Sequence, residues 1–430
     1  MASASPRVTV FTATRETRFL DRCLASERAQ SWPDWEWIVV LTEAARWRPD
    51  ADDSQVTVVV ADDLVAAGAA KQRACASASG EILVGLEAED ELRTDALQRI
   101  VAAFDASADV GVVYSNSGRI DESGDVTDNQ WDLDNGWVHS EVWFDDRKAL
   151  QVHALEPYPH NLSYVWFAPT HVLAFRRTTY EQAGGYDPER DIFDDQDLAC
   201  RLYERTDFEH LDECLYLEGW PAVELSPAAP AQTFDQDEVN ARVQNQSVAL
   251  YDTYVQRNAL AWSARRGLAA LDLGAAHNKP AGYLGLDQYP GDAVDIVGDI
   301  TKGVDLPDSS VGVIRAVDFL EHITDKVAMF NEVYRLLAHG GMLLSLTPSA
   351  DGRGAFQDPT HVAFYNENSF WYFTDAEYAS YVPEISCRFQ VSRLATFFPD
   401  EWHEQHKIPY VCANLIAIKD GPRMGGLLKV

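Results

Sequence analysis

Basic residues are scarce in this chain of 430 residues, which has 35 Lys and Arg against 68 Asp and Glu and a formal net charge of −33. Contacts to nucleic-acid phosphates and anionic lipids require a local excess of positive charge. The composition therefore argues against nucleic acid or an anionic membrane as a partner. Because the acids are spread along the whole chain, their simplest role is solubility.

Cysteine pairs and long apolar runs are also missing. The six cysteines form no Cys-x-x-Cys pair and several lie in apolar stretches, which predicts reduced core residues rather than disulfides or a zinc site. No apolar run approaches the about 18 residues of a membrane span. The first residues, MASASPRVTVF, lack the basic start and apolar centre of a signal peptide. We therefore expect a cytoplasmic protein without a membrane span.

Strands and helices alternate through the first half of the chain. The length predicts two or three domains at about 150 residues each. Apolar β-branched runs predict strands at 7–12, 35–41, 55–61 and 81–90, and helical patterns fall at 17–30 and 66–79. This alternation predicts a parallel sheet with ligands beyond the carboxyl ends of its strands. Residues 131–170, rich in Trp, His and Pro, are expected to form loops or a lid.

The fourth of these strands runs into the acidic stretch EAED at 87–90. These residues by themselves leave two interpretations open. One is a solvated turn, and the other is a site for Mg²⁺ or Mn²⁺, which bind one or two carboxylates together with phosphate oxygens.

Three longer motifs follow one another in this half: VTVFTATRETRFLDRCLASERAQSWPDWEWIVV, ASGEILVGLEAEDELRTDAL and RRTTYEQAGGYDPERDIFDDQDLACRL. Their order and spacing resemble the family 2 glycosyltransferases of the GT-A fold, over about residues 6–220. The resemblance implies sugar transfer, usually with inversion, from a UDP- or GDP-linked nucleotide sugar to a glycan or glycoconjugate acceptor.

The resemblance also implies roles for single residues. Glu87 and Glu89 fall on the family's Asp-x-Asp, which places Glu87 at the donor and Glu89 on a Mn²⁺ or Mg²⁺ ion bridging the diphosphate. Asp195 falls on the general base, with Asp194 as a neighbour that could exchange with it. The remaining donor-binding candidates are Thr12, Glu43 and Lys71. Lys71 is either a phosphate contact or an ordinary surface lysine.

This half departs from the family at three points. Glu-x-Glu replaces Asp-x-Asp, LTEA replaces Asp-Asp-Gly-Ser and leaves Glu43 as the candidate base reader, and the histidine often found after the Glu-Asp helix is missing. The departures leave an alternative open, in which this domain binds a glycan without catalysing a reaction.

A second α/β pattern begins at Leu268, after the Pro- and Ala-rich stretch PAVELSPAAPAQT and a helical pattern at 235–262. We therefore expect a first domain at 1–222, a linker and bridging helix at 223–264, and a second domain at 265–430. In the stretch LDLGAAHNKPAGYLGLD, a small-residue turn follows one strand and Asp287 ends the next. A cofactor can approach such a turn closely, and the acid can accept ribose hydroxyls. An ordinary βαβ turn is the alternative, and the glycine spacing does not fit NAD.

The residues that follow, LPDSSVGVIRAVDFLEH and EVYRLLAHGGMLLSLTP, complete a pattern that closely resembles class I S-adenosylmethionine-dependent methyltransferases, over roughly 267–420. The resemblance implies a Rossmann-like domain with S-adenosylmethionine as cofactor. It places Asp272 and Gly274 at the methionine end, Asp287 on the ribose, Asp299 and Ile300 by the adenine, and Asp318 facing the sulfonium and the acceptor.

Two histidines are candidate bases for methyl transfer to an alcohol. They are His322, in LEH, and His361, in DPTHVAFY. A base near the attacking hydroxyl assists such a transfer, whereas a purely structural hydrogen bond is the alternative for His322. The two resemblances together predict a bifunctional glycan-modifying enzyme. Joining two such sites in one chain makes chemical sense, because tethering raises the effective concentration of a shared intermediate.

Overall fold

The computed structural model describes residues 5–41, 47–49, 53–61, 66–127, 137–164, 168–219 and 236–419. The chain divides into two compact units, Met1–Val255 and Gln256–Val430. Each unit has its own β-sheet with helices between the strands, so the predicted α/β class is confirmed.

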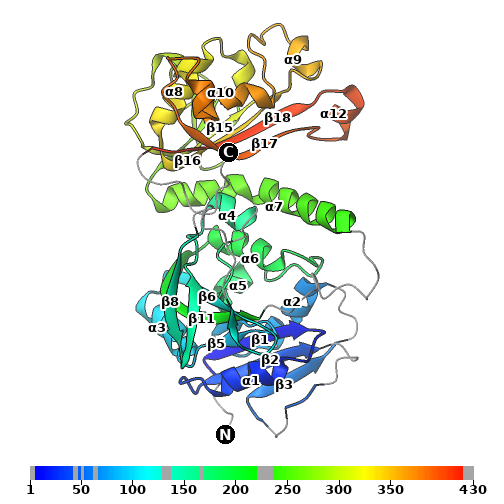
Figure 1. Ribbon diagram of the computed structural model, residues 1–430. Helices are drawn as coiled ribbons and strands as arrows, with labels where there is room; N and C mark the ends of the chain where they lie inside the picture. The colour runs from blue at the N-terminus through cyan, green and yellow to red at the C-terminus, as the bar shows by residue number, and fades with distance from the viewer. Residues whose placement is uncertain are drawn as a thin grey trace. The chain divides into compact units, whose positions relative to one another are not determined.

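The first unit opens with four parallel strands in the order β3-β2-β1-β4 (Figure 1). Each lies where a β-branched apolar run predicted it: β1 Val8–Thr14, β2 Trp35–Leu41, β3 Val56–Val60 and β4 Ile82–Gly85. Helix α1 (Leu20–Arg28) follows β1, and α2 (Ala67–Ser77) follows β3. The carboxyl ends of β1 and β4 therefore lie side by side at one edge of the sheet.

Beyond β4 the sheet continues in the order β10-β6-β11-β5. Strand β10 is antiparallel to both β4 and β6, whereas β11 is parallel to β6. The strands of this part are β5 Glu91–Leu92, β6 Val110–Ile120, β7 Val126–Thr127, β10 Ala174–Arg176 and β11 Asp207–Gly219. Its helices are α3 Ala96–Ala106, α4 Pro159–Ser163, α5 Arg177–Gln182 and α6 Asp194–Tyr203.

The segment 131–170 is more regular than the sequence predicted. Strand β8 (His139–Phe144) pairs antiparallel with β9 (Arg147–Val152), and β9 joins the main sheet at β6. The prediction of loops or a lid is wrong for this hairpin. The pairing of β9 with β6 is a contact between residues far apart in the chain, which the local pattern does not reveal.

Apolar side chains cover both faces of the first sheet, because successive residues of a strand point to opposite sides. On one face, Val8 and Val10 of β1 pack with residues of α1 and α3. On the other, Phe11 packs with residues of α2, α5 and α6. These two apolar layers hold β1 and β4, and therefore their carboxyl ends, in place.

Helix α7 (Gln236–Arg265) carries the chain from the first unit into the second, and it agrees with the helix predicted at 235–262. Within the first unit, the Tyr254 hydroxyl donates a hydrogen bond to Asp197 of α6 at 2.7 Å. The two units divide after Val255, inside α7. The predicted domain boundaries stay a prediction, and the linker before α7 lies outside the described residues.

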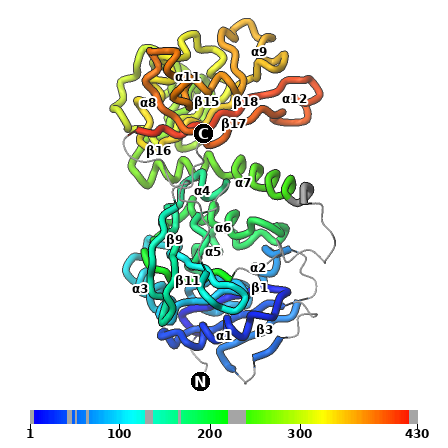
Figure 2. The backbone as a smooth tube through the Cα atoms, in the orientation of Figure 1, coloured from blue at the N-terminus to red at the C-terminus, as the bar shows by residue number. Residues whose placement is uncertain are grey.

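The sheet of the second unit has the order β14-β13-β12-β15-β16-β18-β17. Its strands are β12 Ala269–Leu273, β13 Leu284–Asp287, β14 Ile296–Val297, β15 Val311–Val317, β16 Leu337–Pro348, β17 Phe389–Phe397 and β18 Tyr410–Ala417. Strands β12 to β16 are parallel, whereas β18 is antiparallel to both β16 and β17. The last two strands of the chain, β17 and β18, therefore form an antiparallel pair (Figure 2).

Short helices connect these strands. They are α8 Lys326–Leu336, α9 Gly354–Gln357, α10 Trp371–Thr374, α11 Ala376–Ala379 and α12 Glu401–His406, with 3-10 turns η2 Ile300–Lys302, η3 Leu320–His322 and η4 Glu367–Phe370. Phe330 of α8 stacks on Phe373 of α10 with ring centres 3.9 Å apart. None of the helices in the described part of the chain is both long and apolar enough to cross a bilayer.

Candidate active sites

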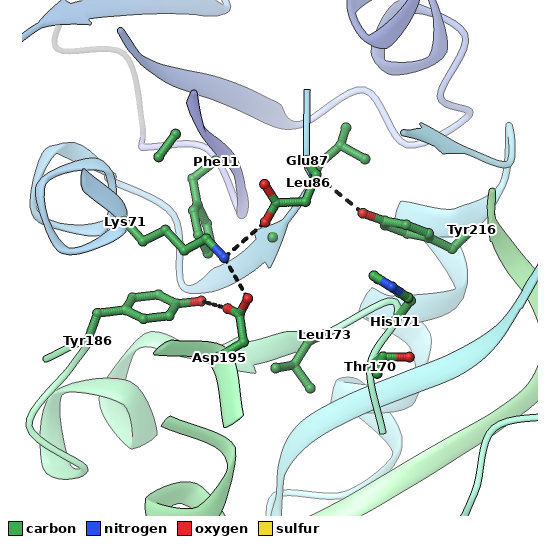
Figure 3. Close-up of a pocket in the computed structure, with 12 residues that line it drawn as sticks. Phe11, Lys71, Leu86, Glu87, Thr170, His171, Leu173, Tyr186, Asp195 and Tyr216 are labelled. Carbon is green, nitrogen blue, oxygen red and sulfur yellow. Dashed lines mark hydrogen bonds and ion pairs between the residues drawn. The ribbon is translucent and has the colours of Figure 1, made fainter. Parts of the chain in front are cut away.

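A pocket of the first unit lies at the carboxyl ends of β1 and β4 (Figure 3). Strand β1 contributes Phe11 and Ala13, and Glu87 comes just after β4. The other lining residues are Lys71, Gly85, Leu86, Thr170, His171, Leu173, Tyr186, Asp195 and Tyr216. This is the sheet edge where the alternation of strands and helices predicted a ligand.

A single ammonium group joins the predicted donor and acceptor sides of this pocket. Lys71 Nζ lies 2.9 Å from Glu87 Oε1, 3.2 Å from Asp194 Oδ2 and 2.5 Å from Asp195 Oδ2. The lysine is only 8% exposed, so it is not an ordinary surface residue. The structure thus brings together four residues from three separate segments of the chain.

These contacts shift the pKa values of the two neighbouring aspartates, Asp194 and Asp195, in opposite directions. Burial acts to raise the pKa of Asp195, but the charge of Lys71 and hydrogen bonds from Lys71 and Tyr186 outweigh it, so this pKa lies below its ordinary value. For Asp194, burial dominates and the pKa rises to about 6 although Lys71 opposes the change. Asp195 lines the pocket, whereas Asp194 does not. Of the two, Asp195 is the better placed to remain ionised and face a ligand.

The local fold of α6 explains why acids gather here. Phe193 precedes the helix in the left-handed conformation, with φ of 58°, and the first turn carries Asp194, Asp195 and Asp197. The partial positive charge of a helix N-terminus favours carboxylates at such positions. Asp197 forms an ion pair with Arg201 of the same helix at 2.6 Å, which is a structural contact.

The acidic stretch after β4 contains groups in contrasting environments. Burial, and then the charge of Glu87, raises the pKa of Glu89 to about 7. Asp90 is buried and accepts hydrogen bonds from the Tyr216 hydroxyl and, at 2.7 Å, from the Gly219 amide. The Glu87–Glu89 pair is suited to a divalent cation, because a cation relieves the repulsion that opposes ionisation of Glu89.

Two other predicted donor residues are placed less favourably or not described. The Thr12 hydroxyl is buried, donates to the Leu86 carbonyl at 2.6 Å and accepts from Trp37 Nε1 at 2.9 Å. It is not among the residues that line the pocket. Glu43 lies outside the described residues.

Sequence reasoning missed three aromatic residues of the pocket. The Tyr186 hydroxyl donates to Asp195 Oδ1 at 2.8 Å, and the His171 ring stacks on Tyr216 with centres 4.6 Å apart. Tyr186 belongs to the motif GGYD, where only the acids of the motif that follows were singled out. His171 supplies a pocket imidazole, although the histidine expected further along the family pattern is missing.

The second unit has a cleft of about 560 Å³ at the carboxyl ends of its parallel strands. This volume lies within the roughly 300–1,000 Å³ of typical ligand pockets. Five of the predicted cofactor residues line the cleft: Gly274, Asp287, Asp299, Ile300 and Asp318. Residues from four loops that follow different strands therefore meet at one place.

The turn after β12 has the backbone that close approach of a cofactor requires. Gly274 has φ of 75°, and a Cβ atom there would lie 2.8 Å from the Phe319 ring. Asp287, at the end of β13, accepts hydrogen bonds from the amides of Ala276 at 3.3 Å and Tyr289 at 2.9 Å. Each carboxylate oxygen keeps accepting capacity, so Asp287 fits a pair of ribose hydroxyls.

Asp299 and Asp272 have contrasting environments. Hydrogen bonds from Lys302 and Thr301 lower the pKa of Asp299 to about 2, which keeps it ionised at the wall of the cleft. Asp272 is 2% exposed and pairs with Arg315 at 2.7 Å. It does not line the cleft, and its position suits a support for the turn better than a direct cofactor contact.

The two predicted bases lie next to each other. The rings of His322 and His361 meet edge to face with centres 5.1 Å apart. His322 lines the cleft, whereas His361 does not. Asp318, which also lines the cleft, has φ of 49° and donates its amide to the Leu346 carbonyl at 3.0 Å. The cleft wall thus contains one imidazole, His322, and the carboxylate of Asp318, with His361 packed behind His322.

Two family models match the chain. The model described as Glycosyl transferase family 2 matches residues 9–161, and the model described as Methyltransferase domain matches residues 270–345. The first match contains β1, β4 and Glu87, and the second contains β12, Asp287 and Asp318. Both resemblances drawn from the sequence motifs are therefore confirmed.

Individual proteins match part of the chain. O-antigen biosynthesis protein RfbC from Myxococcus xanthus is 27% identical over 229 residues, which are 50% of this chain and 16% of that protein. The crystal structure of TarS from S. aureus with UDP is 14% identical over 50% of this chain and 60% of that chain, with a TM-score of 0.35. The mannosyltransferase PcManGT from Pyrobaculum calidifontis, in complex with GDP-Man and Mn²⁺, is 17% identical over 62% and 77%, with a TM-score of 0.38.

Proposed function

Because the chain joins a family 2 glycosyltransferase domain to a methyltransferase domain, we propose that it is a bifunctional glycan-modifying enzyme. The first unit transfers a sugar from a UDP- or GDP-linked donor with inversion, and the second methylates a glycan hydroxyl with S-adenosylmethionine. The observation that carries this proposal is the meeting of donor-side Glu87 and acceptor-side Asp195 at one lysine in one pocket.

In the first reaction, Asp195 takes the proton of the acceptor hydroxyl while the oxygen attacks the anomeric carbon. The carboxylate is ionised at neutral pH, and the Tyr186 hydrogen bond orients it. Attack from the face opposite the leaving nucleoside diphosphate inverts the configuration. Lys71 is placed to neutralise phosphate charge once a donor displaces its carboxylate partners.

Glu89, with Glu87 beside it, is the residue that would hold Mn²⁺ or Mg²⁺. A bound cation would supply charge neutralisation at the diphosphate leaving group. The family resemblance motivates this assignment, because Glu87 and Glu89 fall on its Asp-x-Asp.

In the second reaction, the cleft residues position the cofactor and the acceptor. Asp287 binds the ribose hydroxyls, the Asp299–Ile300 segment borders the adenine, and the bare backbone at Gly274 admits the methionine end. Asp318 and His322 line the end where the acceptor oxygen attacks the methyl carbon. This alignment in one cleft lowers the entropic cost of an in-line transfer.

The acceptor is a glycan or glycoconjugate, in keeping with the partial match to an O-antigen biosynthesis protein. We also propose a cytoplasmic location. All six cysteines are free and buried, which suits a reducing compartment.

A second candidate is a glycan methyltransferase whose first unit only binds the glycan. The contacts of Asp195 with Lys71 and Tyr186 favour it, because both carboxylate oxygens already have partners.

One pair of variants separates the two candidates. Product formation is measured with labelled donor sugar and, separately, with labelled methyl groups. For the bifunctional enzyme, Asp195→Asn lowers sugar transfer by about 10²- to 10⁴-fold and leaves methylation of a supplied acceptor intact. Asp287→Ala has the reverse effect. Methylation without sugar transfer in the wild-type chain supports the binding-module alternative, whereas unchanged sugar transfer in Asp195→Asn shows that Asp195 is not the base.

A further inference from the structure

Three side chains at the methyl-transfer cleft converge, and the proposed function uses only one of them, His322. Glu321 and His322 lie on η3, directly after β15, and His361 lies in the segment after α9. Each offers one ligand atom, and these atoms all lie within 4.8 Å of one another. Among the described residues, this is the group of three His, Cys, Asp or Glu side chains whose ligand atoms lie close enough to share an ion.

The hydrogen bonds of the two imidazoles set their tautomers. His361 Nδ1 lies 3.0 Å from the Ala355 carbonyl, and His322 Nδ1 lies 3.2 Å from the Thr360 carbonyl. A carbonyl only accepts, so each Nδ1 carries the hydrogen and each Nε2 keeps a lone pair. Metal-binding histidines are oriented in this way, with the far ring nitrogen donating to a carbonyl or carboxylate.

The Glu321 carboxylate is also held in place, by burial and by a side-chain hydrogen bond. Glu321 is 2% exposed, and its Oε2 accepts a hydrogen bond from the Thr347 hydroxyl at 2.6 Å. Its Oε1 lies 4.0 Å from His361 Nε2, too far for a hydrogen bond. The Glu321 carbonyl also accepts the amides of Val362 and Ala363, both at 2.9 Å. These backbone bonds fix the His361 segment against η3, although His361 follows Glu321 by 40 positions in the sequence.

The separation of Glu321 and His361 suits a shared cation better than direct contact. Ligands about 2.1 Å from a first-row cation lie roughly 3–4 Å from one another, depending on the angle at the ion. The observed Nε2–Oε1 separation falls in this range. Two imidazoles and one carboxylate are a common ligand set for such ions and leave coordination positions open.

We propose that Glu321, His322 and His361 form a binding site for a divalent first-row transition metal at the acceptor end of the methyl-transfer cleft. His322 belongs to both the cluster and the cleft, so the open positions of the ion adjoin the place of the acceptor. If the proposed methylation of a hydroxyl is correct, on which this consequence rests, the ion lowers the pKa of the acceptor hydroxyl, and its proton passes to the Asp318 carboxylate of the cleft as the oxygen–methyl bond forms. The histidines are then ligands rather than bases.

The test measures metal binding without any reaction. The full-length chain carrying Glu89→Gln, which removes the proposed ligand of the first unit, is freed of metal with a chelator and titrated with Co²⁺ alone. We expect one equivalent of Co²⁺ by elemental analysis, with visible absorption that reports nitrogen ligands. Adding His361→Ala weakens Co²⁺ binding by at least about 100-fold, because a ligand loss exceeds the 10- to 100-fold effect of outer-shell changes.

The matched control is His406→Ala, which removes a histidine of α12 outside the cluster and leaves Co²⁺ binding unchanged. Binding of S-adenosylmethionine shows that each variant is folded, since His361 and His406 do not line the cleft. If His361→Ala does not fold, Thr347→Val keeps all three ligands and lowers Co²⁺ affinity by about 10-fold.

The proposal is overturned if the parent chain binds no Co²⁺, or if affinity and absorption survive both His361→Ala and Thr347→Val. Its failure is separate from that of the proposed function. Methylation without Co²⁺ binding removes the metal site alone, whereas Co²⁺ binding without methylation removes the proposed reaction alone.

Discussion

At the level of single residues, Lys71 determines the charge state of the pocket in the first unit. Burial works against its ammonium group, but Asp194, Asp195 and Glu87 raise its pKa well above the ordinary value. In return, its charge lowers the pKa of Asp195. The reactivity of the proposed base is therefore set by a residue of another helix.

Replacing Lys71 by Met should move the pH dependence of sugar transfer. Without the ammonium group, burial raises the pKa of Asp195, so the acid stays protonated to higher pH. The acidic limb of the profile of kcat/KM should shift to higher pH. Tyr186→Phe removes only a hydrogen bond and should shift it less. An acidic limb that stays in place in Lys71→Met would show that Asp195 is not the base.

Glu27 of α1 makes stability depend on pH. Both of its carboxylate oxygens are buried without a hydrogen-bond partner, and burial raises its pKa to about 8. In the unfolded chain Glu27 has the ordinary pKa of about 4.3. Its protonated form therefore contributes fully to the free energy of unfolding below that pH, and this contribution is lost as the pH rises from about 4.3 to about 8. Glu27→Gln should stabilise the protein by about 2–4 kcal/mol at pH 8 and little at pH 4. Urea unfolding at both pH values measures this.

The control for this comparison is Glu181→Gln, at an exposed position of α5 in the same unit. This variant should leave the difference in the free energy of unfolding between pH 4 and pH 8 the same as in the wild type. Equal stability of Glu27→Gln and the wild type at pH 8 would contradict the assigned cause.

At the level of elements, the turn after β12 is set by its backbone. Gly274→Ala places a Cβ atom 2.8 Å from the Phe319 ring and strains a φ of 75°. We expect S-adenosylmethionine to bind at least about 10-fold more weakly, the equivalent of about 1.4 kcal/mol. Calorimetric titration with S-adenosylmethionine measures the change.

Gly267→Ala is the matched control for this turn. Gly267 also has a positive φ, of 64°, but a Cβ atom there meets nothing within 4 Å. It should lower stability by about 1–2 kcal/mol through backbone strain and leave cofactor affinity unchanged. Equal losses of affinity in both variants would place the effect in general destabilisation rather than in the turn.

Elements differ in how far the sequence predicted them. Strands β1, β2 and β12 were found because continuous apolar runs between polar turns identify buried parallel strands. The hairpin of β8 and β9 was missed, since its half-exposed residues carry a weak pattern and β9 is held by pairing with β6. Local patterns identify strands that are buried on both faces better than strands at an edge.

At the level of the whole molecule, each unit has its own hydrophobic core. We expect calorimetry to show two unfolding transitions. S-adenosylmethionine at 100 times its Kd should stabilise only one, by about 2.7 kcal/mol, and a nucleotide sugar with Mn²⁺ should shift the other. Asp287→Ala should abolish the first shift alone. A single transition moved by both ligands would contradict independent cores.

The sequence by itself determined the two α/β patterns, their order in the chain and several of the charged residues that line the two candidate sites. These features follow from short-range signals: apolar runs, small-residue turns and acids at strand ends. Only the tertiary structure decided which side chains meet. It placed Lys71 against Asp195 and Glu87, added Tyr186 and His171 to the pocket, and brought His361 beside Glu321. Such meetings depend on how distant segments pack, and packing distances between segments far apart in the chain leave no periodic trace in the sequence.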